Sequence, residues 1–249
     1  MNFLVVNDDG IEAAGIKSLV SALSKAGNVY VCAPDSQRSG KSHSITMSPG
    51  IHVKPATFDG ATAAWMTDGT PADCTKVGLQ FCKDRGIDID IVFSGVNMGS
   101  NLGYDTIYSG TVGAAREAAL QGYRAVAVSV NGHDASHFEA ACSIALKSID
   151  KVIADLPAEM ILNINCPDIP AEEVKGVLTT RLGPNFYADS FNPKGDIYVL
   201  EGNVPDFTWL GDDFDVSANQ NNFATITPIK CDTTEHELLC TLKGWEITI

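Results

Sequence analysis

Short apolar runs alternate with longer amphipathic segments over the first two thirds of the chain. The runs rich in Val, Ile and Leu predict buried strands over residues 2–6, 28–33, 89–95, 124–130 and 159–165. The segments between them have helical spacing and predict helices over residues 13–26, 70–84, 111–121 and 136–155. Such alternation predicts an α/β fold, with a mostly parallel sheet covered by helices on both faces.

The pattern changes at about residue 180. Gly and Pro punctuate residues 183–203 around a predicted β-hairpin whose turn lies at or near Lys194 and Gly195. A further strand is expected within 212–229, and residues 236–249 form a tail of mixed polarity. We therefore expect a core over residues 1–180 and a β-rich appendage over 181–249, the hairpin and a C-terminal arm, used in oligomerisation. Earlier in the chain, residues 51–58 and 63–67 are expected to form a short extended pair.

Composition excludes several classes of protein. The chain has 249 residues, of which 45% are hydrophobic, so it can bury a sizeable core. It has no apolar stretch of membrane-spanning length, and its seven scattered cysteines never occur as C-x-x-C. The first residues lack the long apolar run and basic start of a secretory leader, so we do not expect one. We expect a cytoplasmic protein with reduced thiols that does not bind membranes. The net charge of −14 argues against a nucleic-acid polymer as partner but is compatible with a small phosphorylated ligand.

Polar side chains follow three of the predicted strands. Asp8 and Asp9 come directly after the first, Ser39 lies in the loop after the second, and Asn97 follows the run at 89–95. Ligands of an open parallel sheet bind beyond the carboxyl ends of its strands, so these side chains should converge. The same segments contribute further candidates for substrate contact, namely Lys41, His43, Asn101 and Asp105.

The oxygen-rich set at these strand ends suggests a metal ion. Carboxylate, hydroxyl and amide oxygens are hard ligands that suit Mg²⁺, Mn²⁺ or Ca²⁺. A divalent cation would also offset the repulsion between the adjacent carboxylates of Asp8 and Asp9. The structural alternative is that one aspartate caps the helix near residue 13 while the other is solvated. The convergence of Ser39 and Asn97 on the same edge favours the metal.

A second candidate site lies at the start of the helix predicted over 111–121. Ser109, Gly110 and Thr111 would place free N–H groups, two hydroxyls and the positive end of the helix dipole in the crevice. Such an arrangement binds anions, most often phosphate. Alternatively these residues only cap the helix. The neighbouring metal site favours phosphate.

Common nucleotide-binding and hydrolase motifs do not fit the chain. The "SGKS" at 39–42 lacks the earlier glycine of a P-loop, because Asp35 occupies that position. The first strand is followed by Asn-Asp-Asp-Gly, and not by the dinucleotide fingerprint G-x-G-x-x-G. No G-x-S-x-G nucleophile elbow occurs. A P-loop enzyme, a nicotinamide dehydrogenase and an α/β-hydrolase are therefore all disfavoured.

An ordered set of motifs resembles the SurE family, the survival-protein 5′/3′-nucleotidases. The motifs are "VNDDG" at 6–10, "RSGKSHSIT" at 38–46, "GTPADC" at 69–74, "SGVNMGSNLGYD" at 94–105 and "YSGTVGAA" at 108–115. The resemblance implies a Rossmann-like core, which is a three-layer, doubly wound sheet. It also implies homodimers or homotetramers in which the C-terminal arm exchanges between subunits.

The resemblance further implies a metal-dependent phosphomonoesterase. Its substrates would be nucleoside 5′- and 3′-monophosphates, with short polyphosphate as a further one. Asp8, Asp9, Ser39 and Asn97 would hold one divalent ion per subunit, commonly Mg²⁺ or Mn²⁺. Ser109, Gly110 and Thr111 would bind the phosphate.

Several roles stay open at the level of sequence. Asp9 or Asp8 would accept a proton from the attacking water, or Asp8 would act as a covalent nucleophile. His43 is either a general acid or a structural loop residue, and Lys41 would attract phosphate. The same anion site would also serve a non-catalytic nucleotide or metal sensor, which measured turnover would exclude. A metal-dependent transferase would place a D-x-D pattern at a strand end, and Asp8-Asp9 lacks that spacer.

Overall fold

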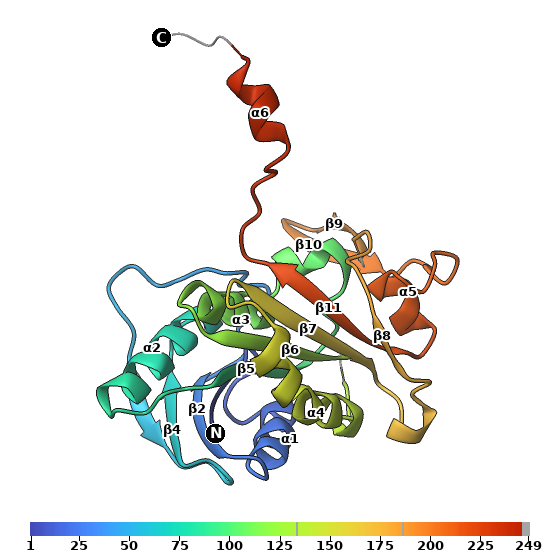
Figure 1. The fold of residues 1–249 in the computed structure, drawn as a ribbon. Coiled ribbons are helices and arrows are strands. Elements are labelled where there is room, and N and C mark those ends of the chain that lie inside the picture. Colours follow the sequence, from blue (N-terminus) through green and yellow to red (C-terminus); the bar gives the residue numbers. More distant parts are fainter. Residues whose placement is uncertain (133, 186, 246–249) are drawn as a thin grey trace.

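A nine-stranded sheet forms the centre of the computed structural model, which describes residues 1–132, 134–185 and 187–245 (Figure 1). Its strand order is β3-β4-β2-β1-β5-β6-β7-β11-β8. The strands are β1 (Asn2–Val6), β2 (Asn28–Pro34), β3 (Val53–Ala56), β4 (Ala63–Thr67), β5 (Ile91–Met98), β6 (Arg124–Asn131), β7 (Met160–Pro167), β8 (Val177–Thr179) and β11 (Ala224–Lys230). The strands from β4 through β7 are parallel, whereas β3 and β11 run antiparallel to β4 and β7.

Helices cover both faces of this sheet. Helices α1 (Ala14–Leu23) and α4 (Glu139–Asp155) pack on one face, and α2 (Pro71–Asp84) and α3 (Gly110–Leu120) pack on the other. Strand alternation explains the two cores, because Phe3 and Val5 point into the first and Leu4 and Val6 into the second. The doubly wound, mostly parallel α/β fold is thus confirmed.

The predicted helices differ from the observed ones mainly at their ends. Helix α2 begins after Thr70, whose side chain accepts a hydrogen bond from the Asp73 N–H in a capping box. Helix α4 begins at Glu139, three residues later than the predicted start at 136. All seven cysteines are free, as expected from their spacing.

The chain beyond residue 180 forms the expected hairpin and also returns to the sheet. Strands β9 (Ala188–Lys194) and β10 (Ile197–Asn203) pair antiparallel around Gly195, whose φ of 71° suits glycine at a tight turn. Strand β11 lies between β7 and β8 in the main sheet, so the sheet does not end at residue 180 as the sequence suggested. The short helix α5 (Asp215–Gln220) was not predicted.

The last described helix, α6 (Leu238–Lys243), stands away from the body of the molecule at the end of an extended segment (Figure 1). Two 3₁₀ turns, η1 (Gly103–Ile107) and η2 (Ala171–Glu173), complete the elements. No helix in the described parts of the chain is both long enough and apolar enough to cross a membrane.

Candidate active site

The acidic pair lies where β1 ends, and the two carboxylates have different partners. Asp8 is 4% exposed, and its carboxylate accepts hydrogen bonds from the Thr111 N–H at 3.1 Å and the Thr111 hydroxyl at 2.6 Å. Asp9 accepts one from the backbone N–H of Met98 at 2.9 Å. Its other oxygen, Oδ1, is buried with no hydrogen-bond partner among the described residues. An unpartnered buried carboxylate oxygen is costly unless a ligand or cation meets it.

Burial makes two negative charges at this position unfavourable. It raises the pKa of Asp8 to about 6, an effect that the charge of Asp9 increases and the hydrogen bond from the Thr111 hydroxyl opposes. Burial also raises the pKa of Asp9, against the hydrogen bond from the Met98 N–H. A bound cation would favour the ionised form of both carboxylates.

A cavity of about 720 Å³ opens beside Asp8, whereas Asp9 is not among its lining residues. Oxygen-bearing residues from separate strand ends line it, namely Asp8, Ser39, Asn97, Asn101, Asp105 and Ser109. Another part of the lining comes from the hairpin region and includes Tyr187, Asp189, Phe191 and Leu200. The structure therefore brings the polar ends of β1, β2 and β5 together, and it adds a partly apolar wall that the sequence did not suggest.

Ser39 and Asn97 reach this cavity from different elements. Ser39 lies in the exposed loop after β2, and its hydroxyl accepts a hydrogen bond from Gln37 at 3.0 Å. The next residue toward the strand, Arg38, ties the loop to the acidic pair through its N–H, which donates to the Asp8 carbonyl at 2.7 Å. Asn97 is 8% exposed, and its Nδ2 donates to the Gly99 carbonyl, which leaves its amide oxygen for a ligand.

The start of α3 is less free to bind an anion than the sequence suggested. The Ser109 hydroxyl accepts a hydrogen bond from the Val112 N–H and so caps the helix, but Ser109 also lines the cavity. Both donors of Thr111 are occupied by Asp8. The Gly110 N–H has no acceptor among the described residues. Ser109, which lines the cavity, and the N–H of Gly110, which is not part of the lining, are therefore the parts of this turn that remain available to phosphate.

Two expected substrate contacts lie elsewhere. His43 does not line the cavity, because its Nε2 is 2.9 Å from a carboxylate oxygen of Glu117. This position argues against the general-acid role that the sequence left open. Lys41 is exposed and also lies outside the lining.

Asn101 and Asp105 line the cavity but have protein partners. The Asn101 side chain donates to the Ser129 hydroxyl at 2.7 Å, and the carboxylate of Asp105 accepts from the Tyr187 N–H at 2.8 Å. Asn163 and Asn165 donate to the Asn101 carbonyl from β7. Sequence reasoning missed these two asparagines, although a polar residue at every second position of a buried strand is a detectable signal.

The donor set fits a hard divalent cation. Asp8, Ser39 and Asn97 line the cavity and offer a carboxylate, a hydroxyl and an amide oxygen. Asp9 is not among the lining residues, but its buried Oδ1 is without a hydrogen-bond partner in the described parts of the chain. Within the described ranges, no group of three or more His, Cys, Asp or Glu side chains is placed to hold a metal. Two of the four expected ligands are Ser39 and Asn97, so the expected metal site does not require three His, Cys, Asp or Glu side chains.

Comparisons with known proteins found relatives that match over nearly the whole chain. The model of the family described as survival protein SurE matches residues 3–189. The 5′-nucleotidase SurE of Desulforudis audaxviator is 40% identical over 258 residues, which cover 99% of this chain and 98% of that protein. The 5′-nucleotidase SurE of Methylococcus capsulatus is 37% identical over 250 residues, or 98% and 97% of the two chains. The crystal structure of the SurE protein from Aquifex aeolicus superposes with a TM-score of 0.85 at 33% identity and covers 99% of this chain and all of that one.

Proposed function

The chain belongs to the survival protein SurE family, and from this membership we infer that it is a 5′-nucleotidase, a hydrolase that releases phosphate from nucleoside monophosphates. The observation that carries the inference is the oxygen-lined cavity around Asp8. Its polar residues come from three strand ends and the start of α3, which is where an α/β sheet binds phosphorylated ligands.

The activity is proposed to depend on one divalent ion, Mg²⁺ or Mn²⁺. Asp8, Asp9, Ser39 and Asn97 would hold it, and the donor chemistry and the unpartnered oxygen of Asp9 support this set. When bound, such an ion supplies Lewis-acid stabilisation of the charge on the phosphate oxygens.

The residues of the chain position the phosphate and move a proton. The Gly110 N–H and the Ser109 hydroxyl would bind phosphate oxygens at the start of α3, while Thr111 fixes the orientation of Asp8. Water attacks phosphorus in line with the departing oxygen, and the carboxylate of Asp9 or Asp8 accepts its proton. The bond from phosphorus to the ester oxygen breaks, the departing oxygen takes a proton from solvent water, and the nucleoside leaves with a free hydroxyl.

The nucleoside is proposed to extend from the phosphate toward the hairpin. Tyr187, Phe191 and Leu200 line that part of the cavity and give the base and ribose an apolar surface. The oxygen-lined end contacts only the phosphate, so nucleoside 3′-monophosphates and short polyphosphates are proposed as further substrates.

The protein is also proposed to form a homodimer or homotetramer in the cytoplasm. Helix α6 has no buried residue and exposes Leu238, Leu239, Leu242 and the following Trp245, a surface that a second subunit would cover. Seven free thiols suit a reducing compartment.

The direct test is phosphate release from a panel of nucleoside monophosphates after chelation, and again after Mg²⁺ or Mn²⁺ is added back. We expect the metal to restore turnover in the wild-type protein but not in an Asp9→Asn variant. Nucleotide binding by the wild type without turnover under any metal would favour a sensor and contradict the hydrolase.

A further inference from the structure

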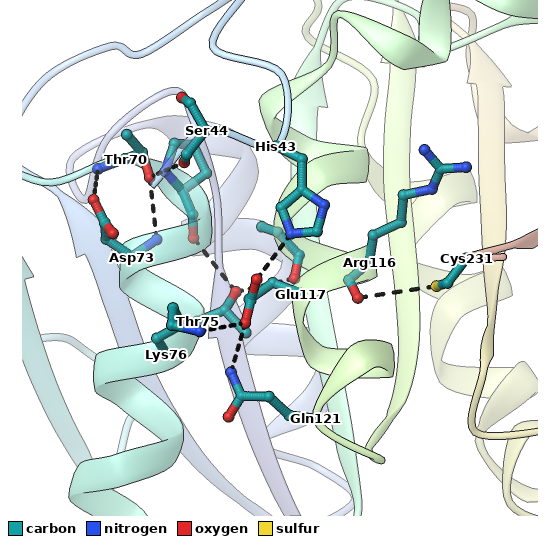
Figure 2. Close-up of polar contacts among 12 residues, drawn as sticks. His43, Ser44, Thr70, Asp73, Thr75, Lys76, Arg116, Glu117, Gln121 and Cys231 are labelled. Atoms are coloured by element: carbon teal, nitrogen blue, oxygen red, sulfur yellow. Dashed lines mark hydrogen bonds and ion pairs between the residues drawn. The ribbon is translucent and has the colours of Figure 1, made fainter. Parts of the chain in front are cut away.

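A buried carboxylate on α3, outside the lining of the cavity, joins three segments. Glu117 is only 6% exposed, and Figure 2 shows its carboxylate among side chains of two helices and a loop. One oxygen lies 2.9 Å from His43 Nε2, and the other accepts from Lys76 of α2 and from Gln121, each at 2.9 Å. We call Glu117, His43, Lys76 and Gln121 the Glu117 cluster.

The Glu117 carboxylate is ionised at neutral pH despite its burial. Burial raises its pKa, but the hydrogen bonds from His43, Lys76 and Gln121 outweigh this effect and lower the pKa to about 2. A buried charge without partners is costly, so removing His43, Lys76 or Gln121 from the Glu117 carboxylate should cost free energy.

His43 belongs to the loop that carries Ser39, here called loop 38–46. The adjacent Ser42 donates its N–H to the Tyr108 carbonyl and its hydroxyl to the Ile107 carbonyl. Its own carbonyl packs against α3 so closely that a Cβ added at Gly113 would lie 2.4 Å from it. Gly113 and Glu117 are four residues apart and therefore share one face of α3, the face on which the loop rests.

The far end of the loop is fastened to α2. The Thr70 hydroxyl donates to the Ser44 carbonyl at 2.7 Å, as Figure 2 shows, and the Thr46 hydroxyl donates to Asp73 at 2.7 Å. Arg38 fastens one end of the loop, and Ser44 and Thr46 fasten the other. In the segment between them, the side chain of His43 links the loop to α3 through Glu117.

We propose that Glu117 and His43 are positioning residues of the active site, because their contact fixes loop 38–46 on α3 and thereby holds Ser39 beside Asp8 and Asp9. Helix α3 is the common frame. Thr111 in its first turn holds Asp8, and Glu117, about 9 Å further along the helix at 1.5 Å per residue, holds the loop. Neither residue touches the substrate. The role in metal binding rests on the proposed function, whereas the fastening of the loop does not.

The test measures loop mobility and metal binding separately. In His43→Ala we expect trypsin to cleave faster after Arg38 and Lys41. Mass spectrometry of the fragments measures the rate of this cleavage. We also expect about tenfold weaker Mn²⁺ binding to the chelated protein, measured by electron paramagnetic resonance. Loss of an outer-shell residue that hydrogen-bonds a metal ligand typically weakens binding by about 10- to 100-fold, and His43 acts on Ser39 only through the loop, so we expect the lower end of that range. Glu117→Ala should match His43→Ala, and the double variant should bind Mn²⁺ no more weakly than either.

Matched variants separate positioning from general destabilisation. His52→Ala removes another histidine–carboxylate pair, the exposed 2.7 Å contact with Asp68, and should change neither readout. Lys76→Met removes a partner of Glu117 that lies on α2, so it should lower stability while Mn²⁺ affinity stays near that of the wild type. Glu117→Gln keeps an acceptor for His43 and should recover much of the loss in Glu117→Ala.

The outcomes distinguish the two proposals. Suppose that the wild type binds Mn²⁺ and releases phosphate. If His43→Ala then has the same tryptic cleavage rate and the same Mn²⁺ affinity as the wild type, the positioning role is overturned. If the wild type neither binds Mn²⁺ nor releases phosphate, the proposed function fails, and the cleavage rates then show whether the loop is fastened at all.

Discussion

Thr111 donates both its backbone N–H and its hydroxyl to the carboxylate of Asp8, at 3.1 and 2.6 Å. The two residues are 103 positions apart in the chain, and the contact joins the end of β1 to the start of α3. The helix N-terminus, which sequence reasoning assigned to phosphate, is thus used partly to stabilise an acid of the protein itself. The orientation of Asp8 in the active site therefore depends on this contact.

Removing the Thr111 hydroxyl should impair catalysis as well as folding. A hydrogen bond to a charged group contributes about 1.5–3 kcal/mol, so Thr111→Val should lower kcat by about 10- to 100-fold. Thr111→Ser should recover much of the rate. Thr75→Val is the matched control, because Thr75 is equally buried and its hydroxyl donates to the Ala114 carbonyl in the interface of α2 and α3. Steady-state kinetics of the three variants measure the effect, and an unchanged kcat in Thr111→Val would contradict it.

The metal-free protein should lose stability as the pH rises through about 6. The pKa of Asp8 is raised from 3.8 to about 6 in the folded state, so the folded protein binds this proton more tightly than the unfolded chain. The contribution is fully present below pH 3.8 and lost above pH 6. At 1.36 kcal/mol per unit it amounts to about 3 kcal/mol.

Urea unfolding in the presence of chelator, between pH 4.5 and 7.5, measures this dependence. Asp8→Asn should lack it, so that the variant gains stability relative to the wild type as the pH rises. Asp68→Asn is the control, because the hydrogen bonds from His52 lower the pKa of Asp68, and the titration of this carboxyl therefore lies below the measured range. Parallel pH profiles for the wild type and Asp8→Asn would show that Asp8 is not the group responsible.

Gly110 has no room for a side chain beside the acidic pair. A Cβ at this position would lie 2.9 Å from Asp8 Oδ2 and 3.0 Å from Pro71 Cγ, so the carboxylate must move in Gly110→Ala. Misplacement of a catalytic group by about 1 Å costs on the order of 100-fold in rate, and we expect a loss of that size in kcat. The double variant with Pro71→Ala relieves the second contact only. Recovery of the rate in that double variant would place the effect at Pro71 and not at Asp8.

Phe191 should affect the nucleoside and not the phosphate. Its side chain is 66% exposed yet lines the cavity, as expected of a surface on which a base stacks. Stacking on an aromatic side chain is worth about 1–3 kcal/mol, so Phe191→Ala should raise KM for nucleoside 5′-monophosphates by about fivefold or more with kcat unchanged. Ribose 5-phosphate, which lacks a base, should show no change. Tyr198→Ala, on the same hairpin but outside the lining, should behave as the wild type. If Phe191→Ala raised KM equally for ribose 5-phosphate, stacking of the base would be excluded.

The sequence predicted local features well and distant pairings poorly. Continuous apolar runs identified β1, β2 and β5 and therefore the strand ends where Asp8, Ser39 and Asn97 lie. Periodicity cannot say which strands pair, and so the return of β11 to the sheet beside β7 was missed. The six-residue helix α5 is too short to give a helical pattern.

Partners of polar side chains were equally hidden from the sequence. His43 is the example, because a loop histidine next to a candidate metal ligand suggests acid–base chemistry. Its actual partner, Glu117, is 74 residues away on the helix that packs beneath the loop. Only the packing of α3 against the loop decides between the two roles, and no local pattern reports that packing.

The C-terminal arm should hold subunits together through the apolar surface of α6. Leu239 and Leu242 are exposed on that helix and contact no core in this chain, so replacing both with Asp should leave the fold intact. In the assembly the new charges would be buried without partners, which is strongly unfavourable, and the double variant should therefore sediment as a monomer. Thr241→Asp adds a charge to the same helix without removing apolar surface and is the matched control. A wild type that already sediments as a monomer, or a double variant that keeps the wild-type mass, would show that α6 is not the contact between subunits.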